Sequence, residues 1–189
     1  GSLILVSGGV WTNHSGAPEQ VDVASGKVNL SQTETEDVSA GLPGGPYTAE
    51  TDLYASFIVN FSTLPSGSGT YFAHFKDTST GFRCRVFAQA NDAAVGKYRL
   101  GIGNGSVSSA SAVVATDLDP DTDYKVVIRF QGTTNSTLWI NPTSESSIVN
   151  RADATDPPQG SYNTHGFALR QGANTQGNCT IDDLLIGTT

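Results

Sequence analysis

The chain has 189 residues and a formal net charge of −8, with 10 Lys and Arg against 18 Asp and Glu. This length is enough for one well-buried domain over residues 1–189. The acidic balance argues against general nucleic-acid binding, which needs a basic surface, and no apolar run approaches the ~20 residues of a membrane-spanning helix. With 21 Gly, 8 Pro and few helix-forming stretches, the composition favours short strands joined by tight turns. Abundant Ser, Thr and Asn with little Lys are typical of extracellular or cell-surface proteins.

The first third of the chain predicts short strands separated by turns, with the most apolar strand in a central position. The segments expected to be strands are Ser2–Val6, Gln20–Val23, Lys27–Leu30 and Leu53–Phe61. Between them, Glu34, Glu36 and Asp37 form an acidic cluster. A solvated turn and a calcium site, which takes clustered oxygen ligands, both remain open for it.

The stretch from Gly69 to Gly103 predicts three consecutive strands, Thr70–Lys76, Phe82–Gln89 and Lys97–Gly103. Apolar and polar residues alternate in each, so that one set can face a core and the other a surface. Strict alternation places Tyr71, Phe75 and Phe82 on the apolar face and Phe72 on the polar one. The polar set comprises His74, Lys76, Arg83, Arg85, Lys97 and Arg99, a concentration of positive charge in an acidic chain.

The remaining third predicts further strands at Val113–Thr116, Tyr124–Phe130, Thr137–Ile140, Gly166–Gln171 and Asn178–Gly187. Asp117–Asp123 alternates acidic residues but lacks the glycine and the distal glutamate of a calcium loop, so an ordinary turn is favoured. Thr143–His165 has no period and is expected to be irregular. Cys84 and Cys179 both fall on expected core-facing positions, which leaves a disulfide and two buried thiols open.

The order of several segments resembles the concanavalin A-like lectin/glucanase (LamG-like) jelly-roll domains of bacterial secreted and surface proteins. The segments that carry it are WTNHSG, LYASFIVNF, YFAHFKD, FRCRVF, YRLGIGNG, LDPDTDYKVVIRF, STLWINP and IDDLLIG. The resemblance implies an all-β sandwich of two packed antiparallel sheets, one of them concave, with sugars bound across the concave face. It also implies a structural calcium ion near the last strand, held by Asp182 or Asp183.

Such domains usually begin with one more strand than this chain shows before Gly1. The last strand is therefore expected to lack a neighbour, and an exposed edge can pair with another chain. Ser2–Val6 is a candidate to fill that place, within its own molecule or in the next one.

Catalysis is not expected from the sequence. The related glucanases carry Glu-x-Asp-x-x-Glu on one strand, which supplies the acid and the nucleophile, and the pattern is missing here. None of the three histidines, His14, His74 and His165, accompanies a Gly-x-Ser-x-Gly nucleophile elbow. We therefore expect a non-enzymatic protein.

Two functions follow. The first is a carbohydrate-binding module, in which the charged face donates hydrogen bonds to an acidic glycan. Its candidate ligand-binding residues are His74, Arg83, Arg85, Arg99, Arg170 and Trp139. Further aromatic residues that could stack on a sugar ring are Trp11, Tyr47 and Tyr162. In the second, the domain is a structural or adhesive subunit of an extracellular assembly or filament. Each group of residues also has a purely structural alternative. The arginines can form ion pairs with Asp77 or Asp92, and the tryptophans can pack in the core.

Overall fold

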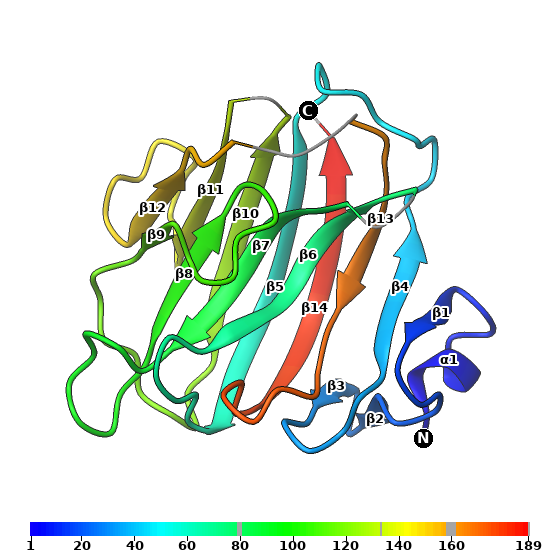
Figure 1. The fold of residues 1–189 in the computed structure, drawn as a ribbon, viewed down its shortest axis with the longest axis horizontal. Coiled ribbons are helices and arrows are strands. Elements are labelled where there is room, and N and C mark those ends of the chain that lie inside the picture. The colour runs from blue at the N-terminus through cyan, green and yellow to red at the C-terminus, as the bar shows by residue number, and fades with distance from the viewer. Residues whose placement is uncertain (79–80, 133, 158–161, 189) are drawn as a thin grey trace.

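The computed structural model describes residues 1–78, 81–132, 134–157 and 162–188, which form two stacked seven-stranded sheets and one short helix (Figure 1). Part of the segment Thr143–His165, residues 158–161, lies outside the described residues. The elements are α1 (Leu3–Val6), β1 (Trp11–Ser15), β2 (Asp22–Ala24), β3 (Lys27–Leu30), β4 (Asp37–Gly41), β5 (Leu53–Thr63), β6 (Thr70–Asp77), β7 (Phe82–Gln89), β8 (Arg99–Gly103), β9 (Ala112–Val113), β10 (Tyr124–Gln131), β11 (Asn135–Ile140), β12 (Arg151–Ala154), β13 (Thr164–Leu169) and β14 (Asn178–Thr188). No helix in this part of the chain is long and apolar enough to cross a membrane.

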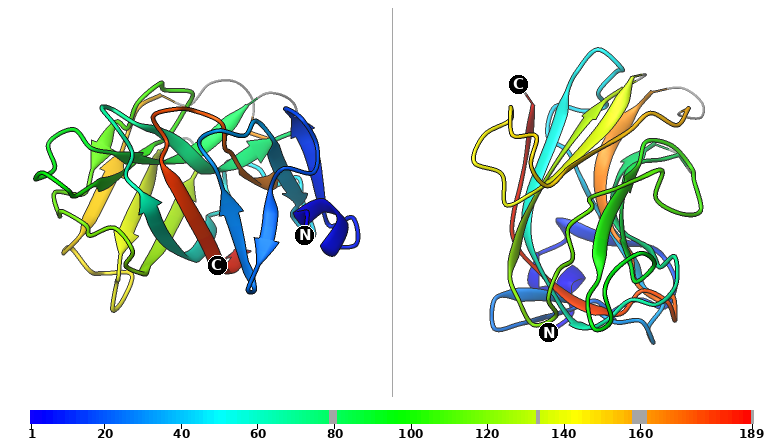
Figure 2. Two further views of the ribbon diagram at one scale, coloured as in Figure 1. Left: turned by 90° about the horizontal axis from the view of Figure 1, so that it is seen from below. Right: turned by 90° about the vertical axis from the view of Figure 1, so that its left-hand side faces the viewer.

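The two layers are seen edge-on in the right-hand view of Figure 2. Sheet A has the strand order β12-β11-β10-β5-β14-β3-β2, and sheet B has the order β1-β4-β13-β6-β7-β8-β9. The paired strands run antiparallel, and neighbours far apart in the chain, such as β5 with β14 and β4 with β13, lie between the hairpins. This is a β-sandwich of jelly-roll type, as expected.

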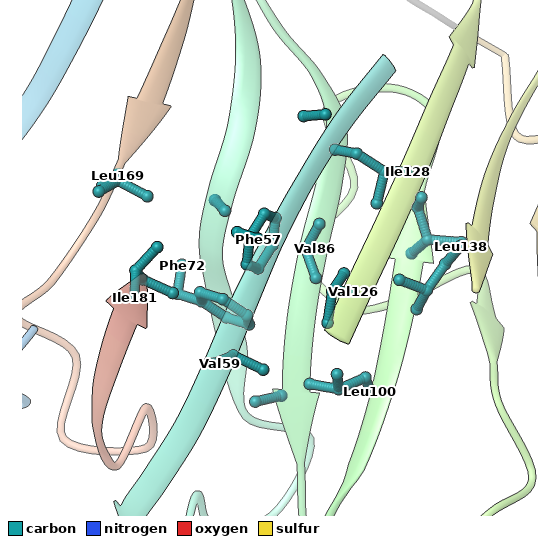
Figure 3. Packing of buried hydrophobic residues seen from close by; sticks show 14 of the residues in the cluster. Phe57, Val59, Phe72, Val86, Leu100, Val126, Ile128, Leu138, Leu169 and Ile181 are labelled. Carbon is teal, nitrogen blue, oxygen red and sulfur yellow. The ribbon is translucent and has the colours of Figure 1, made fainter. Parts of the chain in front are cut away.

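The core fills the space between the sheets (Figure 3). The strict alternation of β5 buries every second residue from Leu53 to Phe61, which confirms it as a central strand. Phe72 of sheet B packs edge-on against Phe57 and Phe61 of sheet A, with ring centroids 6.2 and 5.5 Å apart. Large apolar side chains meeting across the layers supply most of the area removed from water.

Most of the predicted strands are present, but β1 and β4 were not predicted, and Val113–Thr116 contributes only Val113 to β9. Two further segments differ in kind. Ser2–Val6 is not a strand: the N–H of Leu3 bonds Val21 O at 2.7 Å, after which the chain turns into α1. Only Leu3 of this helix is buried, so the apolar run contributes one side chain to the core and does not pair with a sheet along its length. The segment Thr143–His165, expected to be irregular, contains β12 and the first residues of β13.

Alternation fails in β6 and β7 because each strand carries a bulge. The register steps from Tyr71↔Phe87 to Ala73↔Val86 and then to Phe75↔Arg83, so extra residues are inserted first in β6 and then in β7. As a result Phe72 belongs to the core and Tyr71 to the outer face, the reverse of the sequence prediction.

Cys84 and Cys179 are free thiols, one in each sheet, and both are buried. Burial raises the pKa of the Cys84 thiol to about 12. The two side chains therefore behave as small apolar groups.

Candidate functional site

A cluster of aromatic and basic side chains lies on the outer face of sheet B, away from the core. From β6 it includes Tyr71 and His74, and from β7 it includes Phe82, Arg85 and Phe87. Their ring centroids lie close together: 4.5 Å for His74 and Phe82, 5.4 Å for Tyr71 and His74, and 5.8 Å for Tyr71 and Phe87. Phe87 is fully buried yet lies outside the core cluster, because other groups of this outer face cover it.

Tyr71 is flanked by two guanidinium groups. The Cζ of Arg85 lies 4.5 Å from the ring centroid, and the Cζ of Arg170 lies 4.6 Å from it. Arg85 comes from β7 and Arg170 directly follows β13, and these strands lie on either side of β6. The phenol ring therefore separates two cations and stabilises both through its π face.

These two arginines differ from the rest in their partners. The other four arginines each form an ion pair with a carboxylate: Arg83–Asp77, Arg99–Asp117, Arg129–Glu145 and Arg151–Asp153. Within the described residues, Arg85 instead donates to Val107 O at 2.8 Å and Ser106 Oγ at 3.4 Å, and its buried Nε has no hydrogen-bond partner. Arg170 donates to Thr70 Oγ1 at 3.0 Å. Among the described residues, neither Arg85 nor Arg170 has a carboxylate at contact distance.

Two histidines extend the cluster. His14 lies on β1, three strands from β6 in the sheet order, yet the ring centroids of His14 and His74 are only 6.4 Å apart. Flat strands at about 4.8 Å spacing would hold them much further apart, so sheet B curves inward here. Ser39 and Ala168, small residues on the intervening strands, occupy the floor between them.

Both histidines are neutral near pH 7. Burial lowers the pKa of His74 to about 3, and only 1% of the residue's surface is exposed. Burial also lowers the pKa of the half-buried His14, with a further contribution from Lys76. A neutral imidazole at partial exposure can accept a proton.

The loop between β8 and β9 forms one wall of the site. Gly103 lacks a side chain where a Cβ would overlap Val107, so the loop packs closely on β8 and brings Val107 O to Arg85. Asp156 fixes the start of this loop by accepting the N–H groups of Asn104 and Gly105 at 2.8 Å each. The wall is therefore held by the structure and does not depend on a ligand.

Two carboxylates lie near the cluster without pairing to it. Asp37 accepts from Ser15 Oγ at 2.8 Å, and burial raises the pKa of its carboxyl group. Asp156 accepts backbone N–H groups, as described. Among the described residues, neither carboxylate makes an ion pair with Arg85 or Arg170. Asp37 attracts Arg170, and Asp156 attracts Arg85, only at longer range.

Of the predicted ligand-binding residues, the structure brings His74, Arg85 and Arg170 together and separates the others. Arg83 is buried against Tyr162, 5.3 Å from its ring centroid, and is paired with Asp77. The bulge at Cys84 turns it away from the outer face, which the alternation could not show. Arg99 lies further along β8 and is paired with Asp117 at 2.6 Å.

Trp139 lies in sheet A, on the opposite side of the molecule. It is 1% exposed, its Nε1 donates to Ser147 O, and Arg129 and Arg151 lie 5.5 Å from its ring. Trp11, Tyr47 and Tyr162 pack at the margin of the core. None of these aromatic rings joins the cluster around Tyr71.

The calcium site predicted at Asp182 and Asp183 stays a prediction, because calcium also takes backbone oxygen atoms and water as ligands. Asp182 and Asp183 are neighbours at a bulge in β14, and the N–H of Asp183 bonds Asp182 Oδ1. No group of three or more His, Cys, Asp or Glu suited to a metal occurs among the described residues. In the acidic cluster near β4, Glu36 is fully buried and accepts backbone N–H groups of Glu19, Gln20 and Val21, so it is neither a solvated turn residue nor a free ligand.

Sequence reasoning missed Tyr71, His14 and Phe82 as members of the site. Tyr71 and Phe82 were assigned to the core face, and His14 lies in a separate strand. The three-residue spacing of Tyr71 and His74 would have indicated the cluster only to a reader who knew of the bulge at Phe72.

No protein-family model and no curated protein matches the sequence. Solved structures do match in fold. An alginate lyase from Alteromonas has a TM-score of 0.61 at 9% identity and covers 97% of this chain and 96% of its own. An alginate lyase from Pseudomonas aeruginosa has a TM-score of 0.57 at 12% identity, covering 92% of this chain and 87% of its own. The exoplasmic/lumenal domain of VIP36 with calcium and mannose bound has a TM-score of 0.53 at 13% identity, covering 95% and 83%.

These matches correct the expectation of a non-enzymatic protein. Structures of this fold that match nearly the whole chain include lyases, so the lack of a glucanase carboxylate pair and of a nucleophile elbow does not exclude catalysis. Elimination needs neither feature, because a base and an acid suffice. At these identities the likeness establishes the fold, and the activity is argued from the site.

Proposed function

We propose that this chain, which has the concanavalin A-like jelly-roll fold, binds an acidic polysaccharide on the outer face of sheet B and cleaves it by elimination. The observation that carries the proposal is the position of Arg85 and Arg170 against the ring of Tyr71, with no carboxylate partner for either arginine in the part of the chain that the structure describes. Sugar carboxylates would supply the missing anions. The fold neighbours include alginate lyases and a mannose-bound lectin domain, which supports a carbohydrate ligand.

The binding chemistry follows from the two guanidinium groups. Each presents a planar set of N–H donors that matches a carboxylate, and hydrogen bonds to charged groups contribute about 1.5–3 kcal/mol. The inward curve of sheet B between His14 and His74 gives a sugar chain a floor of small side chains, Ser39 and Ala168. The net charge of the whole chain is −8, which disfavours binding of a polyanion away from this basic face.

Elimination in a uronic acid chain removes the proton on the carbon next to the carboxylate and breaks the glycosidic C–O bond on the following carbon, leaving a C=C bond. The His14 imidazole, neutral and half-buried, is suited to take the proton. Arg85 and Arg170 would stabilise the negative charge that moves onto the carboxylate. The Tyr71 hydroxyl, which makes no hydrogen bond within the described residues, is suited to protonate the leaving oxygen.

Polymers of this kind lie outside cells, and the matched VIP36 domain is exoplasmic or lumenal. We therefore propose an extracellular or cell-surface location.

Binding is tested by affinity electrophoresis in gels that contain alginate, polygalacturonate or hyaluronan, with neutral mannan as the comparison. We expect retardation by at least one acidic polymer and none by mannan. Arg85→Ala and Arg170→Ala should each weaken binding about tenfold or more. Arg151→Ala, which removes a paired arginine from sheet A, is the matched control and should bind normally. Failure to bind any acidic polymer would refute the proposal.

Cleavage is tested separately by the ultraviolet absorbance of the new C=C bond and by the size of the polymer after incubation. His14→Ala should abolish the absorbance change while binding persists. Binding of the wild-type chain without any absorbance change would reject elimination and leave recognition as the function.

A further inference from the structure

Strand β14 is longer than its neighbour on one side. It pairs with β5 along its full length, from Asn178↔Thr63 to Thr188↔Leu53. On the other side β3 pairs only with Cys179, Thr180 and Ile181. Among the described residues, no strand and no backbone hydrogen bond occupies the second edge of residues 183–188. In Figure 1 these residues form the upper half of the red strand, and the open edge is the one on the side away from β5.

An apolar hollow adjoins this edge. It measures about 340 Å³ and is lined by Leu184 and Ile186 of β14, by Leu53 of β5, and by Tyr47 and residues 40–43 of sheet B and the loop after it. None of the lining residues is charged. The hollow therefore lies where alternate side chains of one more strand would point if that strand were added to sheet A.

The edge is protected only at its start, by the charged Asp183 and the bulge there. Residues 184–188 read LLIGT and contain no charged residue and no Pro. Leu185, on the face opposite the hollow, is 72% exposed. Natural sheets protect such edges with Lys, Pro or a covering segment, and an unprotected apolar edge pairs with other chains.

We propose that this edge is a docking site for an extended segment of a partner protein, which adds to sheet A as a strand, places apolar side chains in the hollow and carries a basic residue at the end that lies beside Asp182 and Asp183. These two acidic residues lie at the start of the open edge, at the bulge in β14. A neighbouring hollow is lined by Asp183 together with one basic residue, Lys125.

Charge also selects between a partner and a second copy. Two copies of this chain each carry −8, so self-pairing at the edge brings two acidic molecules together. A basic extended segment gains attraction instead. Main-chain hydrogen bonds supply affinity in such strand addition, and the pocket for alternate side chains supplies specificity.

The test is isothermal titration calorimetry with a capped seven-residue peptide that alternates Val and Thr and has Lys at both ends. The comparisons are the same peptide with Glu in place of Lys, and one with a central Pro. We expect the first to bind and the other two to bind at least tenfold more weakly. Amide hydrogen exchange should slow at residues 183–188 when the peptide is present.

Ile186→Asp places a charge in the hollow and should abolish binding, and Ile186→Ala, a milder change, covers the case that the first variant does not fold. Val95→Lys alters an exposed apolar residue elsewhere and is the control. Arg85→Ala should leave peptide binding unchanged, which separates this site from the polysaccharide site. Equal binding of all three peptides, or no binding, would overturn the proposal, as would a dimer of the free protein that protects the same edge.

Discussion

Arg83 donates two hydrogen bonds to Asp77 Oδ2, at 3.0 and 2.7 Å, and both side chains are almost completely buried. Arg85, two residues later in the same strand, faces outward and contacts no carboxylate among the described residues. Neighbouring residues of one type thus have different tasks. Arg83 completes the interior, and Arg85, although only 8% exposed, belongs to the outer face.

Arg83→Ala should therefore lower the free energy of unfolding by about 3–5 kcal/mol, because it leaves the Asp77 carboxylate buried without its partner. Arg151→Ala, which breaks the exposed pair with Asp153, should cost less than about 1 kcal/mol. Urea unfolding of both variants measures the two values. Equal losses would show that Arg83 does not contribute as a buried ion pair.

The Tyr71 ring and the Tyr71 hydroxyl can be separated by substitution. Tyr71→Phe keeps the ring between Arg85 and Arg170, so polysaccharide binding should change by no more than about threefold, while elimination should stop. Tyr71→Ala removes both ring contacts, each worth about 0.5–2 kcal/mol, and should weaken binding by about tenfold. Retained elimination in Tyr71→Phe would show that another group protonates the leaving oxygen.

Acid should destabilise the protein through His74. Its pKa is about 3 in the folded chain, against 6.5 as the ordinary value, so between these limits the unfolded chain binds more protons than the folded one. Stability is then complete above pH 6.5 and falls as the pH drops toward 3, by at most about 1.4 kcal/mol per pH unit for this one group.

His74→Gln removes the titrating group, and its unfolding free energy should depend less steeply on pH between 6.5 and 4 than that of the wild type. The measurement is urea unfolding at half-unit intervals of pH. Parallel curves for the two proteins would mean that His74 is not held neutral by burial.

The cysteines give a test of the interior. Both thiols are buried, and burial raises the pKa of each, so neither should react with a thiol reagent in the folded protein at pH 8. Unfolding in urea should expose both to reaction. Rapid labelling of either residue in the native state would contradict its burial.

Sequence reasoning predicted the sandwich because long strands such as β5 alternate without interruption. Composition and alternation were sufficient to predict the fold class. Sequence reasoning also predicted part of the site, since His74, Arg85 and Arg170 do come together. It wrongly placed Arg83 with them and Tyr71 in the core. The reason is that a bulge belongs to the pairing of two strands and leaves no mark in either sequence alone.

The sequence analysis named Asp77 among the partners of the arginines, and Arg83 does pair with it, but the other ion pairs were hidden. Arg99 pairs with Asp117 in a later turn, and Arg129 pairs with Glu145 beyond the next strand. Such partners are set by how loops fold back over the sheets. The sequence shows that cations are present, and only the fold shows which of them lack counter-charges.

The left-handed backbone of Cys84, with φ 51°, lies between the two arginines of β7 that face opposite ways. Two residues at positions i and i+2 of a regular strand face the same side, so a β7 without this bulge would carry Arg83 and Arg85 on one face. The extra residue at Cys84 shifts the alternation by one position, which places Arg83 beside Asp77 in the interior and Arg85 beside Tyr71 on the outer face. The number of residues in β7, as much as their identity, thus decides which guanidinium group belongs to the outer face.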